Sequence, residues 1–421
     1  MQTVTTSNGF ETYALILTAG PAMGTLLDSS AFPQIPAYVG TVFAITLLGW
    51  GIGGMIGGVL ADYIGRKRTM IIAILAYSIM TGLTAFAFDW LSFALLRFLV
   101  GVAIGSEWAT GASMVAELWP DRARGKGAGL MQSGLQIGFF IASLLWLFVG
   151  QLGPDSWRYM FLIGILPGAL TLWIRTSISE PELWQRADAQ RRAALERKHS
   201  GTVLTAADQS LARFTIADLF VEPEIRRRTI IVFAMSLATT LSWWGISTFV
   251  PPYLAGAAGK AGLAAQQQWA TYGALLFNFG AILGQVGFGF LADRFGRKPI
   301  TLTYFAAAYA MTPALFMWTN DPALLLPLAA VNGFFCSGLF AWMPAWLPEL
   351  FPTHLRATAL AFGFNMPRFV AFLGPLLAGT LIVQFGGYGQ TAMLISCVYI
   401  LGVAVTPLLP ETKGKMLPDR V

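Results

Sequence analysis

The sequence is poor in charge, cysteine and histidine. Only 11% of the 421 residues are charged and 56% are hydrophobic, whereas an ordinary soluble domain has roughly 25% charged residues. The two cysteines, Cys336 and Cys397, lie within apolar runs, and the two histidines, His199 and His354, lie in polar connections. Neither pair has the spacing of a disulfide framework or a metal site. We therefore expect an integral membrane protein, and we predict no disulfide, no metal ion and no bound cofactor.

Motifs for nucleotide binding and for hydrolysis are also missing. Neither the phosphate-binding pattern G-x4-G-K-[ST] nor the zinc-binding pattern H-E-x-x-H occurs. The first eight residues carry no charge, so they lack the basic segment of a cleavable signal peptide. The net charge of +6 comes from basic residues in separate connections, so we predict no nucleic-acid partner. These absences argue against a built-in ATP motor, and against the alternative of a membrane-embedded enzyme or sensor.

Long apolar runs, by contrast, are abundant. A helix needs roughly 20 residues to cross a hydrocarbon core of about 30 Å. Twelve runs are long enough, at about 9–28, 38–61, 69–88, 90–117, 128–150, 158–177, 229–254, 269–292, 299–318, 323–347, 358–384 and 390–409. We predict an all-α integral membrane fold with twelve transmembrane helices in two six-helix bundles, residues 1–178 and 228–409. A cytoplasmic linker, 179–227, joins the bundles, and a cytoplasmic tail, 410–421, follows them.

The distribution of the 27 Lys and Arg residues predicts the orientation. If both termini are cytoplasmic, 23 of these residues lie on the cytoplasmic side and only Arg158 and Lys260 lie outside. The remaining two, Arg97 and Arg368, lie within spans. Cytoplasmic loops carry an excess of Lys and Arg, so we predict cytoplasmic termini.

The two halves of the chain repeat each other. The segment "GGVLADYIGRKRT" (57–69) returns as "GFGFLADRFGRKPI" (287–300), and "AELWPDRARG" (116–125) returns as "PELFPTHLRA" (348–357). Asp62 and Asp293 are 231 residues apart, and Glu117 and Glu349 are 232 apart. Parallel six-span repeats that meet around a central site are the architecture of an alternating-access transporter.

These segments resemble the signature of the major facilitator superfamily, D-x-x-G-R-K after spans two and eight. The segment "RFLVGVAIG" (97–105) is similar to the superfamily's fourth-span motif, and "PETKG" (410–414) is similar to the end-of-chain signature of its sugar-porter branch. The stretch "GSEWATGASMVAELWPDRARGKGAGLMQSG" (105–134) resembles the bacterial organic-acid and sialate proton symporters, which stand near the aromatic-acid and metabolite symporters. Their first span carries D-G-F-D, so Glu11 matches the second acid, whereas Asn8 departs from the first.

Four charged residues stand out within the predicted spans: Glu11, Arg97, Glu107 and Arg368. A charge near the bilayer centre costs roughly 2.5–3.5 kcal/mol or more, so each one needs a partner, a water-filled cavity or a function. Arg368 lies ten residues into the eleventh span, or about 15 Å at 1.5 Å per residue. We predict that it binds substrate, because a guanidinium offers a planar, permanently charged fork to a carboxylate. The alternative is a structural ion pair with another span.

Proton coupling requires a group whose protonation changes between the two sides of the membrane. Glu11 and Glu107 are both candidates, and the sequence does not choose between them. Glu107 could instead lock its span to a neighbour, and Glu11 could be a helix N-terminal acid favoured by the helix dipole. Arg97 could tune a nearby acid or simply extend toward the outer surface.

Uncharged residues of the spans could line the same cavity. A small-molecule site needs a few polar groups within aromatic and apolar walls. The predicted lining residues are Tyr13, Gln132, Gln136, Trp243, Trp244, Asn278 and Asn365. For each of them ordinary helix packing is the alternative.

The repeated loops predict a cytoplasmic gate. Gly49, Gly53 and Gly57 form a stripe that lets another helix approach closely, which would place Asp62 where it caps a neighbouring helix and pairs with Arg66. The matching charge network of the sugar-porter branch implies the gate residues Asp62, Arg66, Glu117, Arg124, Asp293, Arg297, Glu349 and Arg356, with Glu180 and Glu411 beside them. The alternative is that these charges serve only topology and solvation.

Together these features predict a secondary active transporter. The expected partners are a small organic anion such as a carboxylate, protons as the coupling ion and the lipid bilayer of a bacterial inner membrane. We expect uptake by symport and a monomeric chain. A sugar or polyol porter of the same superfamily is the alternative, but a neutral polyol needs amides and hydroxyls more than an intramembrane arginine.

Overall fold

The computed structural model describes residues 2–169, 179–200, 203–263, 266–373, 381–382 and 384–418. Within these ranges the chain is helical, without strands. The first half contains α1 (Gln2–Leu26), α2 (Ile35–Ile64), α3 (Arg66–Thr84), α4 (Trp90–Leu118), α5 (Arg124–Val149) and α6 (Ser156–Ile163). Short 3-10 turns lie at Ser29–Gln34, Asp121–Ala123 and Leu166–Ala169. The end of the predicted sixth span lies outside the described residues.

The second half follows the same order. It contains α11 (Pro223–Lys260), α12 (Gln266–Phe295), α13 (Arg297–Met317), α14 (Pro322–Cys336), α15 (Trp342–Trp346), α16 (Arg356–Asn365), α17 (Arg368–Ala371), α19 (Tyr388–Ser396) and α20 (Val398–Val405). Further 3-10 turns lie at Gly338–Ala341, Leu347–Glu349, Thr353–Leu355 and Thr406–Leu408. Among the described residues, eight helical segments are long and apolar enough to cross a membrane. The first and third predicted spans, α1 and α3, are not among these eight.

Helix boundaries differ from the predicted ones at several points. The first helix begins at Gln2 and not near residue 9, and α11 begins at Pro223, inside the predicted linker. The tenth span is interrupted near Ser337, and the eleventh is interrupted at Met366–Pro367, where α16 ends and α17 begins. Proline lacks the N–H that would continue the helix ladder, so this second break has a direct cause. Residues 374–380 of the eleventh span and 419–421 of the tail lie outside the described residues.

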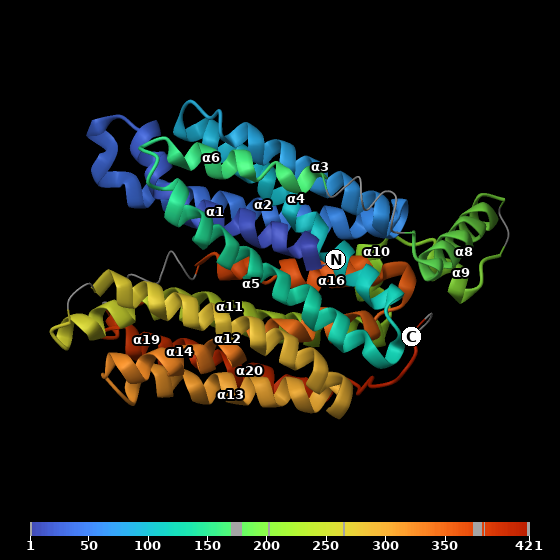
Figure 1. Ribbon diagram of the computed structural model, residues 1–421. Coiled ribbons are helices and arrows are strands. Elements are labelled where there is room, and N and C mark those ends of the chain that lie inside the picture. Colours follow the sequence, from blue (N-terminus) through green and yellow to red (C-terminus); the bar gives the residue numbers. More distant parts are fainter. Residues whose placement is uncertain are drawn as a thin grey trace.

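Three linker helices connect the halves: α8 (Glu182–His199), α9 (Ala206–Leu211) and α10 (Thr215–Val221). In Figure 1 the blue-to-teal half and the yellow-to-red half lie against each other, and α8 and α9 extend beyond one end of the bundles. The labels for both chain ends lie toward that same end. Arg191 of α8 donates to the Asp62 carbonyl at 2.7 Å and also bonds the His354 carbonyl. The linker therefore contacts both halves.

Glycine permits the closest helix contacts of the first half. A Cβ at Gly53 would lie 1.9 Å from the Val102 carbonyl oxygen, and one at Gly49 would lie 2.3 Å from the Phe98 carbonyl oxygen. The predicted glycine stripe of α2 therefore packs directly on the α4 backbone. Gly54, on another face of α2, is equally close to Asn365 of the second half.

The repeated loops share one backbone conformation. Gly65 separates α2 from α3 with φ 110°, and Gly296 separates α12 from α13 with the same value. This positive φ strains any residue that has a Cβ. The sequence repeat is therefore also a structural repeat.

Candidate functional site

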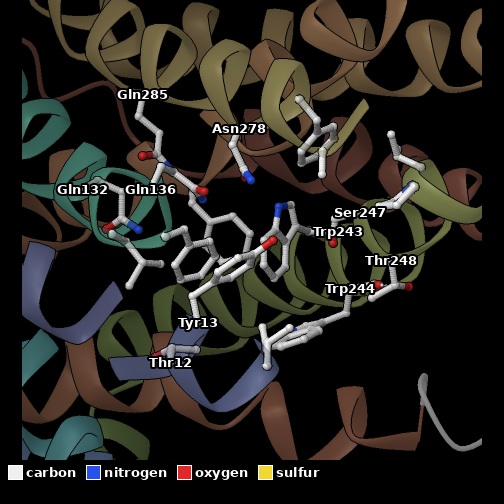
Figure 2. Close-up of a pocket in the computed structure, with 18 of the residues that line it drawn as sticks. Thr12, Tyr13, Gln132, Gln136, Trp243, Trp244, Ser247, Thr248, Asn278 and Gln285 are labelled. Carbon is white, nitrogen blue, oxygen red and sulfur yellow. Dashed lines mark hydrogen bonds between the residues drawn. The ribbon is translucent and has the colours of Figure 1, made fainter. Parts of the chain in front are cut away.

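A cavity of about 310 Å³ lies between the two halves (Figure 2). Eight aromatic side chains form most of its wall: Tyr13, Trp50, Phe139, Trp243, Trp244, Phe277, Phe340 and Phe364. Its polar lining consists of Thr12, Gln132, Gln136, Ser247, Thr248, Asn278, Gln285 and Arg368. An aromatic wall with a few convergent polar groups is the usual form of a small-molecule site.

The structure brings seven of the eight predicted substrate-site residues to this cavity. They are Tyr13, Gln132, Gln136, Trp243, Trp244, Asn278 and Arg368. The placement of Asn365 in the lining was wrong. It is fully buried between α2 and α16, where its amide donates to the Ala361 carbonyl at 3.0 Å. Its side-chain oxygen accepts a hydrogen bond from Arg368 at 3.2 Å. Asn365 therefore contacts the Arg368 guanidinium without lining the cavity itself.

Four amides line the cavity. Gln132 and Gln136 come from α5, and Asn278 and Gln285 come from α12. Figure 2 shows the three glutamines toward one side of the view, Asn278 nearer the centre, and Ser247 and Thr248 toward the other side. Each half therefore contributes two amides to the lining.

The sequence prediction missed several lining residues. Gln285 lies seven residues after Asn278, which is two turns along the same face of α12, so helical spacing could have found it. Ser247 and Thr248 likewise lie one turn after the predicted pair Trp243 and Trp244. The aromatic residues of the wall had no comparable signal, because apolar side chains are as common on the lipid-facing surface.

Arg368 is the only cation of the described cavity lining. Its guanidinium is 93% buried and lies 4.5 Å above the Trp50 ring and 4.0 Å above the Phe364 ring. It donates to the Phe364 carbonyl and to Asn365. Among the described residues, no carboxylate lies within ion-pair distance of it, and its Nε has no hydrogen-bond partner. The predicted alternative of a structural ion pair is therefore absent from this part of the chain.

A ring stack lies beside Arg368 and joins the halves. The Trp108 ring of α4 lies on the Phe364 ring of α16, with centroids 3.6 Å apart and planes 8° from parallel. The Trp108 indole donates to Gln132 at 3.0 Å. Phe364 lines the cavity, so this stack closes part of the cavity wall.

Glu11 and Arg97 form a buried ion pair. Arg97 also donates to the Thr84 hydroxyl at 2.7 Å, and its guanidinium lies 4.5 Å from the Phe161 ring centroid. A small side cavity of about 30 Å³ reaches this pair and shares Thr12 and Trp50 with the central cavity. The pair therefore borders a side cavity that adjoins the candidate site.

Glu107 has different surroundings. Its carboxyl is 1% exposed and accepts a hydrogen bond from the Asn8 amide of α1. No described Lys, Arg or His side chain lies within ion-pair distance of it. The sequence could not choose between these two acids. In the structure Glu11 is paired with Arg97, whereas Glu107 has no cation partner among the described side chains.

The predicted gate residues form two ion-pair clusters at the end of the bundles that contacts the linker helix α8. In the first, Arg66 binds Asp62 at 2.8 Å and Glu117 at 3.2 Å, and Arg356 of the second half binds Glu117 at 2.8 Å. Asp62 also accepts from the Thr358 backbone N–H at 2.8 Å. As predicted, Asp62 both pairs with Arg66 and caps a helix, α16, of the other half.

The second cluster repeats the first with the halves exchanged. Arg297 binds Asp293 at 2.8 Å and Glu349 at 2.9 Å, and Arg124 of the first half binds Glu349 at 2.9 Å. Asp293 accepts from the Gly125 backbone N–H at 3.0 Å, so it caps the start of α5. Each half therefore holds the other through one capped helix and one buried ion pair.

Two further carboxylates bind the repeated loops. Glu180 accepts from the backbone N–H of Arg66 at 2.5 Å and of Lys67 at 3.2 Å. Burial raises the pKa of the Glu180 carboxyl, and these two donors lower it only in part.

Glu411 is the corresponding residue of the second half. It accepts from the backbone N–H of Arg297 and of Lys298, both at 3.0 Å. Burial acts on this carboxyl too, but those donors, together with the N–H groups of Lys413 and Thr412, lower its pKa below the ordinary value. The twin sites thus differ in the number of donors.

Every hydrogen bond and ion pair between the two bundles found in the described residues lies at the end occupied by the two ion-pair clusters. They involve the ends of α2, α4 and α12 and the starts of α5 and α16. The Trp108–Phe364 stack lies between these contacts and the central cavity. The conformation is therefore closed at the end of the bundles where these contacts lie.

This arrangement of two six-helix halves, a central cavity and paired ion-pair clusters at one end is that of a major facilitator transporter. The chain belongs to the sugar (and other) transporter family, whose pattern it matches over residues 13–419. It is a transporter and not an enzyme.

Individual relatives agree with this assignment. A putative metabolite transport protein of Haemophilus influenzae is 31% identical over 389 residues, covering 91% of this chain and 89% of the relative. The cis,cis-muconate transport protein of Acinetobacter baylyi is 28% identical, with 89% and 85% covered. The sialic acid transporter NanX of Escherichia coli is 27% identical, with 88% and 82% covered.

The fold is also similar to a solved structure, the proton:xylose symporter XylE. The TM-score is 0.75 at 21% sequence identity, with 99% of this chain and 96% of that chain covered.

Proposed function

We propose that this protein takes up a small organic anion, such as a carboxylate, together with protons by alternating access. Arg368 carries the proposal. A guanidinium that is buried beside a cavity without a carboxylate partner leaves a positive charge uncompensated. A bound anion supplies that missing charge, and the aromatic wall supplies apolar contact for its body.

The relatives support an organic anion over a sugar. Muconate and sialic acid, the ligands named for two of them, are both carboxylates. The sugar or polyol porter stays the alternative, because the fold neighbour is a xylose symporter and the cavity contains four amides. A neutral sugar would leave the Arg368 charge unpaired, which is why we favour the anion.

In the proposed cycle the anion and a proton enter from the outside while the cytoplasmic end is closed. The halves then rock about the central cavity, as in other transporters built from repeats. The Trp108–Phe364 stack and both ion-pair clusters must separate before the ligands leave to the cytoplasm. The gate role of these residues is part of the proposal.

The proposal also fixes the setting. We place the chain in the inner membrane of a bacterium with both termini in the cytoplasm, since the Lys and Arg asymmetry favours that orientation. The transport unit is the single chain, because one chain forms the whole cavity. The proton is the coupling ion, and no cofactor is needed.

The test is thermal stabilisation of the purified protein by a panel of benzoate, cis,cis-muconate, sialic acid and D-xylose. A ligand that binds the folded state raises the melting temperature in proportion to its occupancy. We expect at least one acid to stabilise the wild type. Arg368→Gln should weaken that binding by about 30-fold or more, the effect of removing one partner of a buried charge pair, about 2–5 kcal/mol.

Two controls make this experiment decisive. Lys260→Gln removes an exposed cation at the end of α11 and should leave binding unchanged. Arg368→Lys keeps the charge but loses the planar fork, so its affinity should lie between those of the wild type and Arg368→Gln. Unchanged acid binding in Arg368→Gln, or stabilisation by D-xylose alone, would refute the anion proposal.

A further inference from the structure

We propose that Glu107 binds the coupling proton as a neutral carboxyl paired with the Asn8 amide, while Glu11 stays ionised against Arg97. This inference rests on the proposed function in one respect, that transport is coupled to protons. It does not depend on which substrate the cavity binds.

The first argument is the missing counter-ion. Glu107 lies 17 residues into the 29-residue helix α4, which places it about 26 Å from the outer end of that helix. Its side chain is buried, and no described cation is within ion-pair distance. An isolated carboxylate is strongly disfavoured in such surroundings, so the neutral form is the stable one.

The second argument is an unsatisfied atom. The Asn8 amide nitrogen donates to Glu107, but the Asn8 oxygen, also buried, has no hydrogen-bond partner. An ionised Glu107 has only acceptors and cannot satisfy that oxygen. A protonated Glu107 carries an O–H donor, so an amide and a carboxylic acid can exchange two hydrogen bonds. Protonation therefore satisfies a buried group that is otherwise unsatisfied.

Glu11, which lies on α1 together with Asn8, provides the contrast to Glu107 of α4. It faces the Arg97 guanidinium directly, and the two charges compensate each other in the membrane interior. Arg97 is further held by the Thr84 hydroxyl and the Phe161 ring. Protonation of Glu11 would leave that arginine buried without a counter-ion, which is strongly unfavourable. Glu11 is thus the poorer proton carrier in this conformation.

The other helices packed around Glu107 supply no compensating charge. From α3, Tyr77 lies within electrostatic reach of both Glu107 and Glu11, and it is neutral at physiological pH. From α5, Met131 and Gln132 lie nearby and do not titrate. Among the described side chains of these helices, none places a charge within ion-pair distance of Glu107, and the amino terminus of the chain is the one charged group that favours its ionised form.

The position of Glu107 connects proton binding to the gate. The next residue, Trp108, stacks on Phe364 of the other half. Opening of the cytoplasmic side must separate these rings and bring water toward α4 next to Glu107. Hydration favours the ionised carboxylate, so the proton leaves when the gate opens.

The experiment is infrared spectroscopy of the purified, ligand-free protein in the carbonyl region at neutral pH. A protonated carboxyl has its own carbonyl band, separate from those of carboxylates and amides. We expect this band in the wild type and its loss in Glu107→Gln. It should persist in the double variant Glu11→Gln, Arg97→Gln, which removes the ion pair as a unit. Asn8→Leu should keep the band but shift its frequency, because the carboxyl loses its hydrogen-bond partner.

The outcomes separate this inference from the proposed function. A spectrum of Glu107→Gln identical to that of the wild type, with the variant still folded by its melting temperature, would overturn the assignment. Loss of the band in the double variant would overturn it in favour of Glu11. Neither result concerns anion binding, so a failure of the Arg368 test leaves the proton assignment intact.

Coupling itself has a separate readout. In Asp293→Asn, which removes the helix cap of α5, we expect the Glu107 band to lose amplitude as spin-label distances report an opened cytoplasmic side. A band that stays at full amplitude in an opened protein would show that Glu107 keeps its proton throughout. Glu107 would then be a structural residue.

Discussion

Gly53 shows at the scale of one residue how tightly the first half is packed. A Cβ there would lie 1.9 Å from the Val102 carbonyl oxygen, and the clash is with backbone and not with a mobile side chain. We expect Gly53→Ala to lower the free energy of unfolding by about 1–3 kcal/mol, the usual range for overpacking. The melting temperature of the purified variant measures this effect.

Gly24 of α1 offers a matched control. No atom lies within 4 Å of a Cβ built there. Gly24→Ala should therefore be neutral or stabilise by about 0.5–1 kcal/mol, since alanine loses less backbone entropy than glycine in a helix. Equal effects of the two substitutions would contradict the packing argument.

The sequence predicted individual residues well where a residue type is rare in membranes. Arg368, Glu11, Glu107 and Arg97 could be singled out because charge within an apolar run is unfavourable without a reason. The sequence could not pair them, since Glu11 and Arg97 lie on different helices. Asn8 and Glu107 also lie on different helices, so their contact could not be predicted without knowing how the helices pack.

At the scale of helices, the twin carboxylates Glu180 and Glu411 lead to a prediction about pH. The lowered pKa of Glu411 in the folded chain means that its carboxylate stabilises the fold above about pH 4.3, the unfolded value. That stabilisation is lost as the pH falls through the folded pKa. Glu411→Gln should thus lower stability at neutral pH by about 0.3–1 kcal/mol. The difference from the wild type should shrink in acid.

Glu180 should behave in the opposite way. Its folded pKa is raised, so the ionised form is disfavoured in the fold and stability increases as the pH falls through that pKa. Glu180→Gln should therefore not lower the melting temperature at neutral pH. Melting curves of both variants from neutral pH to about pH 4 test the pair, and identical pH profiles would refute the contrast.

Helix existence was easier to predict than helix continuity. Apolar length gave the order of the spans, because the bilayer imposes a minimum length on each helix. The breaks near Ser337 and at Met366–Pro367 were not predicted. Pro367 was visible, but proline also occurs inside membrane helices without ending them, as Pro251 and Pro252 do in α11. Only packing decides between these cases.

At the scale of the whole molecule, we propose that the crossed ion-pair clusters decide which side of the membrane the cavity faces. Each cluster joins a capped helix of one half to acids of the other. Asp293→Asn weakens one cluster, and Asp62→Asn weakens the other. Because a change of 1.4 kcal/mol shifts an equilibrium about tenfold, we expect each variant to raise the inward-facing population at least several-fold.

Spin-label distances across the cytoplasmic end measure this shift. Cysteines in place of Arg122 and Arg294, which are exposed and lie in opposite halves, carry the labels after Cys397→Ser removes the exposed native cysteine. Asp155→Asn is a suitable control, because that acid pairs with Arg158, which belongs to neither cluster. Distances that match the wild type in both gate variants would contradict the gate role.

The internal repeat let the sequence predict this network at the level of the molecule. Two loops with matched offsets implied twin contacts at one end of the two bundles. What the repeat could not predict is that each acid caps a helix of the opposite half, since that depends on how the halves dock. The volume and lining of the cavity depend on the same docking.

Glu411 also has a practical consequence for anyone who handles this protein. The residues after it return to the gate: Thr412 donates to Glu349 at 2.5 Å, and the Pro418 carbonyl accepts from Arg356 at 3.3 Å. A purification tag or fluorescent reporter that replaced residues from 411 onward would remove these contacts, together with those of Glu411 to Arg297 and Lys298 and of Lys413 to Arg294. Such a fusion would bias the protein toward the opposite side of the membrane before any ligand is added.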